Sequence, residues 1–216
     1  MERKTLKLLR LLIPGLILIF EFLPMLNFMK ISYKIGEEWF AYSFLIIPSL
    51  IIGAIYHMYD IRFTVTNISH RKIDLNITSS LIKIYNKVIT QDQHNFLKSK
   101  RLKHIFYNIV DSDPSLTAKS QLVYFNGLLW TSTADLFILS IFISFVYLIS
   151  GLWLFKSTEV WQYGVIFGGV AALSFCLHIL SIIKHYKLSN DQIEYIETHY
   201  QDELKLKIDK CLDQMN

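Results

Sequence analysis

Four apolar blocks, each long enough to cross a lipid bilayer, constrain the fold of this 216-residue chain more than any other feature. They occupy residues 8–28, 40–59, 136–155 and 160–183. Because a membrane-spanning helix needs about twenty apolar residues, the four blocks use roughly eighty residues and leave little room for a separate soluble domain. We therefore predict an all-α integral membrane protein whose four spans form two hairpins.

The distribution of Lys and Arg predicts that both ends of the chain are cytoplasmic. Four basic residues lie within the first ten positions and ten lie in residues 61–120, whereas residues 27–39 carry two and the turn after the third block carries only Lys156. Basic connections are retained on the cytoplasmic side during insertion. The abundance of Ile, Lys and Asn is typical of an AT-rich bacterial gene, so we expect a multi-pass protein of the bacterial inner membrane.

The blocks divide the chain into four segments: a first hairpin (1–59), a mostly helical cytoplasmic segment (60–135), a second hairpin (136–187) and a cytoplasmic helix (188–216). Polar and apolar residues alternate over residues 61–66, which predicts a short strand or an extended connector. Helical periodicity follows it and predicts two amphipathic helices, the second of which ends before Pro114. Beyond residue 117, a single helix is expected to continue into the third span.

The tail is an amphipathic helix by its periodicity and is acidic by its composition. Residues 188–216 hold seven acidic and three basic groups, a net charge of −4 in a chain whose total is +4. An acidic helix is poorly suited to anionic lipid, so we expect its apolar stripe to contact a soluble protein partner. The stripe comprises Ile193, Ile196, Tyr200, Leu204, Ile208 and Leu212.

Signatures of catalysis, cofactor binding and metal binding are absent from the sequence. Residues 54–126 contain no glycine, so the segment offers no phosphate-binding loop. The seven histidines never form an HExxH motif, and the two cysteines are too far apart in sequence for a thiolate metal site. We predict no catalytic residue, no metal and no cofactor, and therefore a protein that is not an enzyme.

Polar residues within the predicted spans are candidates for function, because an ionisable group in hydrocarbon is costly unless it is paired, protonated or hydrated. Glu21 is expected in the outer half of the bilayer. There it is either a pore-lining or sensing carboxylate, or a residue that snorkels to the headgroups or bonds to a neighbouring helix. His57, His178 and Asp135 are all expected near the inner boundary, where they are able to cluster.

Two further surfaces are predicted from residue spacing. Small residues recur every fourth position along the last span and predict close helix packing, either within the hairpin or between subunits. They are Gly164, Gly168, Ala172 and Cys176. A basic run in the cytoplasmic segment predicts a surface for anionic lipid or for a partner, without direct nucleic acid binding. It contains Lys98, Lys100, Arg101 and Lys103.

Three functions of different class follow: an oligomeric membrane scaffold or sensor that holds a soluble partner, a homo-oligomeric ion channel or pore-forming effector, and a carrier or membrane enzyme. Two hairpins of spans, a basic central segment and an acidic amphipathic tail resemble the membrane subunit of the Kiwa antiphage defence system, which pairs with a soluble DNA-binding subunit. The resemblance concerns the architecture and carries over no functional residues. It implies a homo-oligomer in the inner membrane that senses phage-induced disturbance and recruits a cytoplasmic effector.

Overall fold

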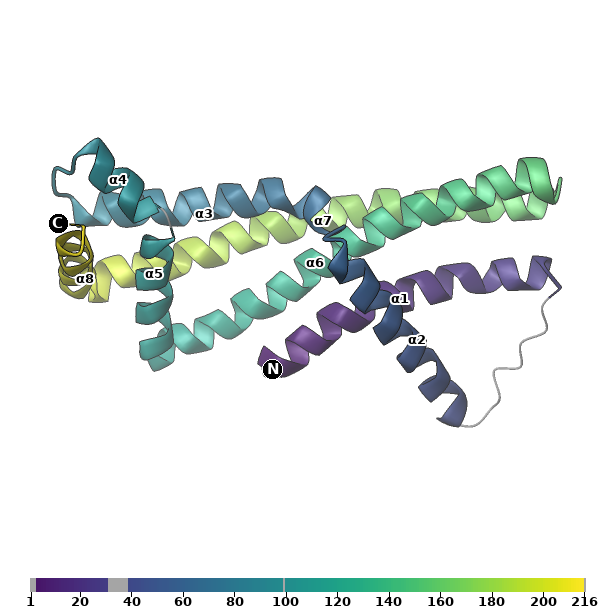
Figure 1. Cartoon of the computed structure of the whole chain (residues 1–216), viewed down its shortest axis with the longest axis horizontal. Coiled ribbons are helices and arrows are strands. Elements are labelled where there is room, and N and C mark those ends of the chain that lie inside the picture. Colours follow the sequence, from purple (N-terminus) through teal and green to yellow (C-terminus); the bar gives the residue numbers. More distant parts are fainter. Residues whose placement is uncertain (1–2, 31–38, 99, 216) are drawn as a thin grey trace. The chain divides into compact units, whose positions relative to one another are not determined.

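The computed structural model describes residues 3–30, 39–98 and 100–215, and these residues form helices joined by short turns (Figure 1). No strand occurs among them. The helices are α1 (Arg3–Phe28), α2 (Trp39–Met58), α3 (Phe63–Tyr85), α4 (Gln91–Lys98), α5 (Arg101–Ser112), α6 (Pro114–Ile149), the short π-helix η1 (Ser150–Leu154), α7 (Thr158–His199) and α8 (Gln201–Asp213).

The predicted all-helical membrane architecture is confirmed at the level of helices that are long and apolar enough to span a bilayer. Three pass on length and composition: α1, α6 with η1, and α7. A fourth is obtained if α2 and α3 are counted together as one broken span, since they bend by 62° at a short break. The four apolar blocks of the sequence coincide with these helices, apart from the final residues Tyr59 and Phe155 of two blocks.

The chain divides into two compact units. The first, called the span unit, comprises Met1–Thr66 and Gly127–Ser181, and the second, called the polar unit, comprises Asn67–Asn126 and Ile182–Asn216. The divisions fall inside α3, α6 and α7, so these three helices contribute residues to both units.

The first hairpin of the span unit is held by glycines that let two backbones touch. A Cβ atom at Gly15 of α1 would lie 1.9 Å from the carbonyl oxygen of Ser49, and one at Gly53 of α2 would lie 1.8 Å from that of Leu11. Neither distance is possible for a real side chain, so α1 and α2 cross at these two glycines. Close crossings of this kind are typical of membrane helices, whose interfaces are rich in small residues.

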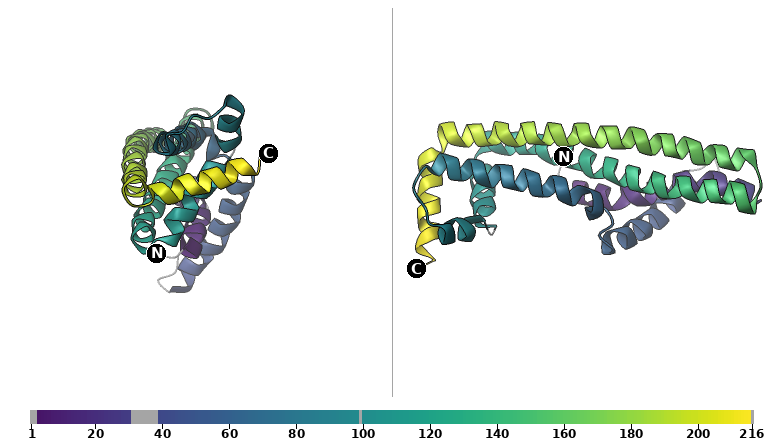
Figure 2. Two further views of the ribbon diagram at one scale, coloured as in Figure 1. Left: turned by 90° about the vertical axis from the view of Figure 1, so that its left-hand side faces the viewer. Right: turned by 90° about the horizontal axis from the view of Figure 1, so that it is seen from above.

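The second hairpin is formed by the later part of α6 and the earlier part of α7, which lie side by side in Figures 1 and 2. A buried apolar cluster of Met25 from α1 with Ile143, Tyr147 and Val160 joins this hairpin to α1. Many of the remaining large apolar side chains of these helices are exposed, among them Phe142, Phe145 and Leu173. An exposed apolar surface of this extent is suited to contact with lipid tails.

The polar unit has an apolar core of its own. Its helices bury Leu81 of α3, Leu97 of α4, Phe106 of α5, Ile196 of α7 and Leu204 of α8. Asp113 caps α6, since its Oδ1 accepts the backbone N–H of Leu116 at 2.7 Å while Pro114 occupies the first helical position. The predicted helix end before Pro114 is therefore confirmed, and a new helix begins there at once.

Three local predictions are wrong. Residues 63–112 form three helices, α3, α4 and α5, rather than the two amphipathic helices predicted. Residues 63–66 are helical rather than extended, because the hydroxyls of Thr64 and Thr66 are bonded to the backbone carbonyls of Ile61 and Arg62 and are thus accommodated in a helix. The tail is also not a separate single helix. Residues 188–199 continue α7, and α8 begins only at Gln201 after a break at Tyr200.

Candidate functional site

The most distinctive polar site of the span unit is a buried ion pair between Arg62 and Asp135. Arg62 Nε donates to Asp135 Oδ1 at 2.8 Å and its Nη2 donates to Oδ2 at 2.5 Å, so the contact is bidentate. The hydroxyl of Tyr56 donates to the same Oδ1 at 3.0 Å. The side chains of Arg62 and Asp135 are 7% and 0% exposed. A pair so fully removed from water depends on complete hydrogen bonding for its stability.

The pair is connected to α1 through the backbone of Arg10. Its carbonyl oxygen accepts a hydrogen bond from Arg62 Nη2 at 3.0 Å and one from His57 Nε2 at 3.1 Å. The network therefore joins α1, the end of α2, the turn that precedes α3, and α6. Asp60, which has a φ of 50°, lies in that turn, where the chain bends between α2 and α3 shortly before Arg62.

The predicted inner cluster of His57, His178 and Asp135 is arranged differently from a direct triad. His178 Nδ1 lies 3.1 Å from the carbonyl oxygen of Trp130, and His57 bonds the carbonyl of Arg10. Both histidines interact electrostatically with Asp135, but among the described residues its hydrogen bonds come from Arg62 and Tyr56. Sequence reasoning missed Arg62, which lies outside the apolar blocks in the segment predicted to be a connector.

Glu21 lies on α1 and faces α6. Its side chain is 6% exposed, and Ser140 donates a hydrogen bond to its Oε1 at 2.5 Å. The hydroxyl of Tyr147 donates to the backbone carbonyl of Glu21 at 3.0 Å, while Oε2 has no hydrogen-bond partner among the described atoms. In this contact Glu21 joins α1 to α6, which corresponds to the predicted alternative of a structural bond to a neighbouring helix.

The small-residue stripe of the last span is partly an intrachain surface. Gly164 lies against Leu148 of α6, and its carbonyl oxygen accepts a 2.6 Å hydrogen bond from Ser144. A Cβ at Gly168 would lie 3.3 Å from the Ser144 hydroxyl. Ala172 and Cys176 are exposed. An α-helix has 3.6 residues per turn, so residues spaced four apart shift gradually around the helix axis. Beyond Gly168 the stripe therefore no longer faces α6.

The tail stripe is covered by the chain itself, which corrects the prediction that it contacts a soluble partner. Ile196, Leu204 and Ile208 are fully buried, Ile193 nearly so, and Tyr200 and Leu212 are half-buried. The hydroxyl of Tyr200 donates to Asp113 Oδ2 at 2.5 Å, so this residue fixes the end of α7 to the start of α6. The stripe forms part of the core of the polar unit.

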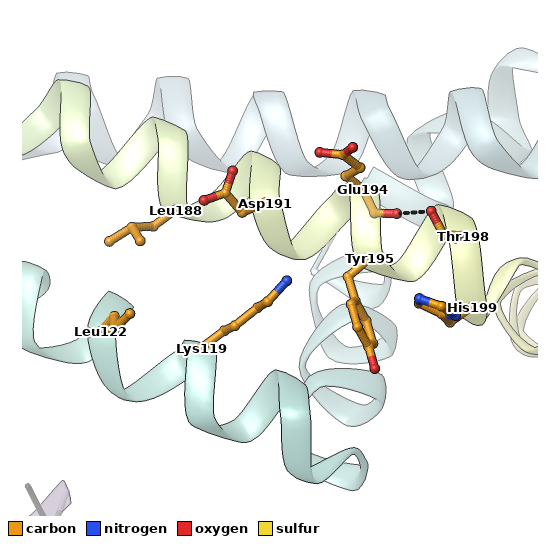
Figure 3. A pocket seen from close by; sticks show the side chains of 8 residues that line it. All are labelled: Lys119, Leu122, Leu188, Asp191, Glu194, Tyr195, Thr198 and His199. Atoms are coloured by element: carbon orange, nitrogen blue, oxygen red, sulfur yellow. Dashed lines mark hydrogen bonds between the residues drawn. The ribbon is translucent and has the colours of Figure 1, made fainter.

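The exposed face of the same tail lines an open cavity of about 480 Å³, called the tail groove (Figure 3). Leu122, Leu188 and Tyr195 supply apolar surface, and Asp191 and Glu194 supply carboxylates. Lys119 extends from α6 toward α7 and its Nζ lies 4.7 Å from the centre of the Tyr195 ring. Within the described residues, neither Asp191 nor Glu194 forms a salt bridge.

The predicted basic surface divides between two roles. Lys103 forms a 2.6 Å salt bridge with Asp74 of α3, and Lys98 and Lys100 are exposed. Arg101 stacks on Phe96, with its guanidinium 3.6 Å from the ring centre, and donates to the Phe96 carbonyl. Arg101 thus joins α4 to α5, and it is not among the residues that line a cavity together with the three lysines.

The attachment of α8 to α3 depends on one carboxylate in the polar unit. Asp209 accepts hydrogen bonds from Lys87 Nζ at 2.7 Å and from the Tyr85 hydroxyl at 2.6 Å. The contact with Lys87, followed by that with Tyr85, lowers the pKa of Asp209 below its usual value of 3.8. Burial and the bond to Asp209 raise the pKa of Tyr85 to about 12.

We expect the attachment of α8 to weaken in acid. A carboxylate with a lowered folded-state pKa stabilises the fold above its unfolded pKa, and that contribution is lost as the pH falls through the folded value. Hydrogen exchange of the α8 amides, corrected for intrinsic rates, should therefore accelerate between pH 5 and pH 3, about the carboxylate range. Asp209→Asn should exchange faster at pH 7 and lose this pH dependence. An α8 that stays equally protected in both proteins contradicts the assignment.

Within the described residues, no group of three His, Cys, Asp or Glu side chains gathers to hold a metal ion. Comparison of the chain with protein-family models, with curated proteins and with solved structures finds no match. The functional argument therefore rests on the geometry of the two units.

Proposed function

We propose that this protein is an oligomeric scaffold or sensor of the bacterial inner membrane that recruits a soluble cytoplasmic partner in antiphage defence. The observation that carries the proposal is the use of α6 and α7 in both units. Residues of one helix contact the membrane-spanning neighbours, and residues further along the same helix build the polar unit. A disturbance of the spans is thereby transmitted along a continuous backbone.

The contacts of the intramembrane polar groups favour this proposal over an ion channel. Glu21 is bonded to Ser140, and Asp135 is bonded to Arg62 and Tyr56. These side chains join helices of one chain and are buried, whereas a pore requires polar groups that face water. For the oligomer, Ala172 and Cys176 supply an exposed surface of small residues on α7, where a second copy is able to approach closely.

The tail groove is the docking surface in this proposal, in place of the buried tail stripe. Its carboxylates, Asp191 and Glu194, project from a tail segment of net charge −4, and its floor is partly apolar. Charge complementarity therefore favours a partner that presents a basic segment with apolar side chains. The orientation predicted from the Lys and Arg distribution places this groove in the cytoplasm.

Reversing one charge in the tail groove should release the partner. We expect Glu194→Lys to lower the amount of soluble partner that purifies with the full-length protein by about tenfold at low salt, because like charges then face each other. The measurement is quantitative mass spectrometry of proteins retained at fixed stoichiometry from native membranes. Asp213→Lys is the matched control, since it makes the same charge change at an exposed tail position outside the groove.

The two variants also test the biological role. Cells that carry this gene with its neighbouring genes should form fewer phage plaques than cells without them, and Glu194→Lys should abolish that difference while Asp213→Lys preserves it. The proposal fails if the wild-type protein retains no soluble protein at fixed stoichiometry, or if Glu194→Lys retains it as well as the control does.

A further inference from the structure

A second cavity of the polar unit, also about 480 Å³, gathers cations from both sides and is called the basic groove. Arg71 contributes from α3, Lys98 from the end of α4, Lys100 from the α4–α5 connection and Lys103 from α5. The one carboxylate that lines it is Asp74. Four cations against one carboxylate give this open cavity a positive potential, which favours the binding of an anion.

The backbone adds to this positive field. Lys100 has a φ of 84° and directly precedes α5, a helix of twelve residues whose N-terminus has no side-chain cap. The first backbone N–H groups of a helix lack intrahelical partners and carry a partial positive charge. Phosphate groups bind readily to helix N-termini of this kind. Here the helix N-terminus lies beside the lysine side chains of the same cavity.

The contacts of Asp74 indicate how such a ligand is held. Its Oδ2 accepts a hydrogen bond from Lys103 Nζ at 2.6 Å, and both side chains are only partly buried. Asp74 thus serves as an internal counter-ion for one of the four cations. An incoming anion with several oxygens is able to take Lys103 from Asp74 and to contact the remaining three cations, whereas a single carboxylate is too small and too weakly charged to match them.

We propose that the basic groove binds a phosphate-bearing anion of two or more negative charges, with Lys98, Lys100 and Arg71 as its direct ligands and Lys103 exchanged from Asp74. The same chemistry is offered by a soluble phosphate compound and by the headgroup of an anionic phospholipid. All the residues belong to the polar unit, so the inference is independent of the recruitment proposed for the tail groove.

The test measures binding of inorganic pyrophosphate to the full-length protein in neutral detergent by calorimetry. Lys98→Gln combined with Lys100→Gly should weaken binding at least about tenfold, since it removes two charge-assisted contacts. Glycine is chosen at Lys100 because a φ of 84° suits it, so the fold is kept. Lys72→Gln with Lys83→Gln is the matched control, because it removes two exposed charges of α3 that lie outside the cavity.

A third variant gives an effect of opposite sign. Asp74→Asn frees Lys103 and removes the only negative charge of the groove, and we expect it to strengthen pyrophosphate binding about threefold or more. A purely structural role for the Asp74–Lys103 pair predicts no such gain. Equal losses in the groove variant and in the control variant would reduce the effect to general electrostatics and overturn the proposal.

A parallel measurement distinguishes the two sources of phosphate. The proteins are reconstituted in nanodiscs of equal parts phosphatidylglycerol and phosphatidylcholine, and the lipid retained after transfer to detergent is counted by native mass spectrometry. Retained phosphatidylglycerol that is lost in the groove variant but kept in the control assigns the site to a headgroup. Pyrophosphate binding without lipid retention assigns it to a soluble compound, and failure of both refutes the site.

Discussion

Replacing Asp135 by asparagine is expected to destabilise the folded chain by about 3–5 kcal/mol, because removal of one partner leaves a buried charge uncompensated. Arg62 is 7% exposed and donates two of its guanidinium hydrogen bonds to Asp135, so water cannot replace the lost carboxylate without opening the bundle. The measurement is the free energy of unfolding of the purified protein in mixed detergent micelles. Asp60→Asn is the matched control, since Asp60 is exposed and asparagine tolerates its positive φ.

A double variant separates the cost of an orphaned charge from the value of the pair. Arg62→Met combined with Asp135→Leu removes both charges and fills similar volume, and it should recover most of the stability lost in Asp135→Asn. If the double variant is instead as unstable as the sum of the single changes, the pair is not an isolated ionic contact. Wild-type stability in Asp135→Asn would refute the buried pair itself.

Local patterns in the sequence predict the helices well because a span is a local property. About twenty apolar residues in succession form a helix wherever the hydrocarbon surrounds them, so the four blocks coincide closely with α1, α2, α6 with η1, and α7. The continuation of α6 from Pro114 into the third block follows in the same way from the absence of proline and from the helical periodicity.

The polar contacts could not be predicted with the same success, since they join distant positions. Arg62 and Asp135 are 73 residues apart, and Arg62 stands in an alternating segment that reads as extended. A usable signal was nevertheless present: each charge follows or precedes an apolar block at the same predicted membrane boundary. A search for opposite charges that flank the apolar blocks at the same predicted membrane boundary would have identified Arg62 as a partner of Asp135. The candidates predicted from the sequence were instead ionisable residues within the spans.

The tail is predicted as one helix because its apolar residues are regularly spaced, although the helix is in fact interrupted at Tyr200. Ile196, Tyr200 and Leu204 keep a spacing of four across the end of α7, so periodicity predicts one helix. The break is set by tertiary contacts: Tyr200 bonds Asp113, and Asp209 bonds Tyr85 and Lys87. An apolar stripe also has the same appearance whether its own chain or a partner covers it, which is why its burial was not foreseen.

Introducing a single methyl group at the crossing of α1 and α2 is expected to be nearly as damaging as breaking the ion pair. In Gly53→Ala the new Cβ would lie 1.8 Å from the carbonyl oxygen of Leu11, and in Gly15→Ala it would lie 1.9 Å from that of Ser49. The obstacle in both cases is backbone, which cannot rotate away as a side chain can. The helices must therefore separate, and we expect a loss of about 3 kcal/mol, the upper end of the usual cost of overpacking.

Gly169→Ala is the control for this substitution, because no atom of the described chain lies within 4 Å of the position its Cβ would take. Alanine is favoured over glycine in a helix by about 1 kcal/mol, so this variant should be neutral or slightly more stable. All three variants carry the same chemical change within apolar helices and are compared by unfolding in the same mixed micelles. Equal stabilities would mean that α1 and α2 do not cross at Gly15 and Gly53. If only Gly15→Ala and Gly53→Ala lose stability, the first hairpin is stabilised by backbone contact between α1 and α2 as well as by the polar network at Asp135.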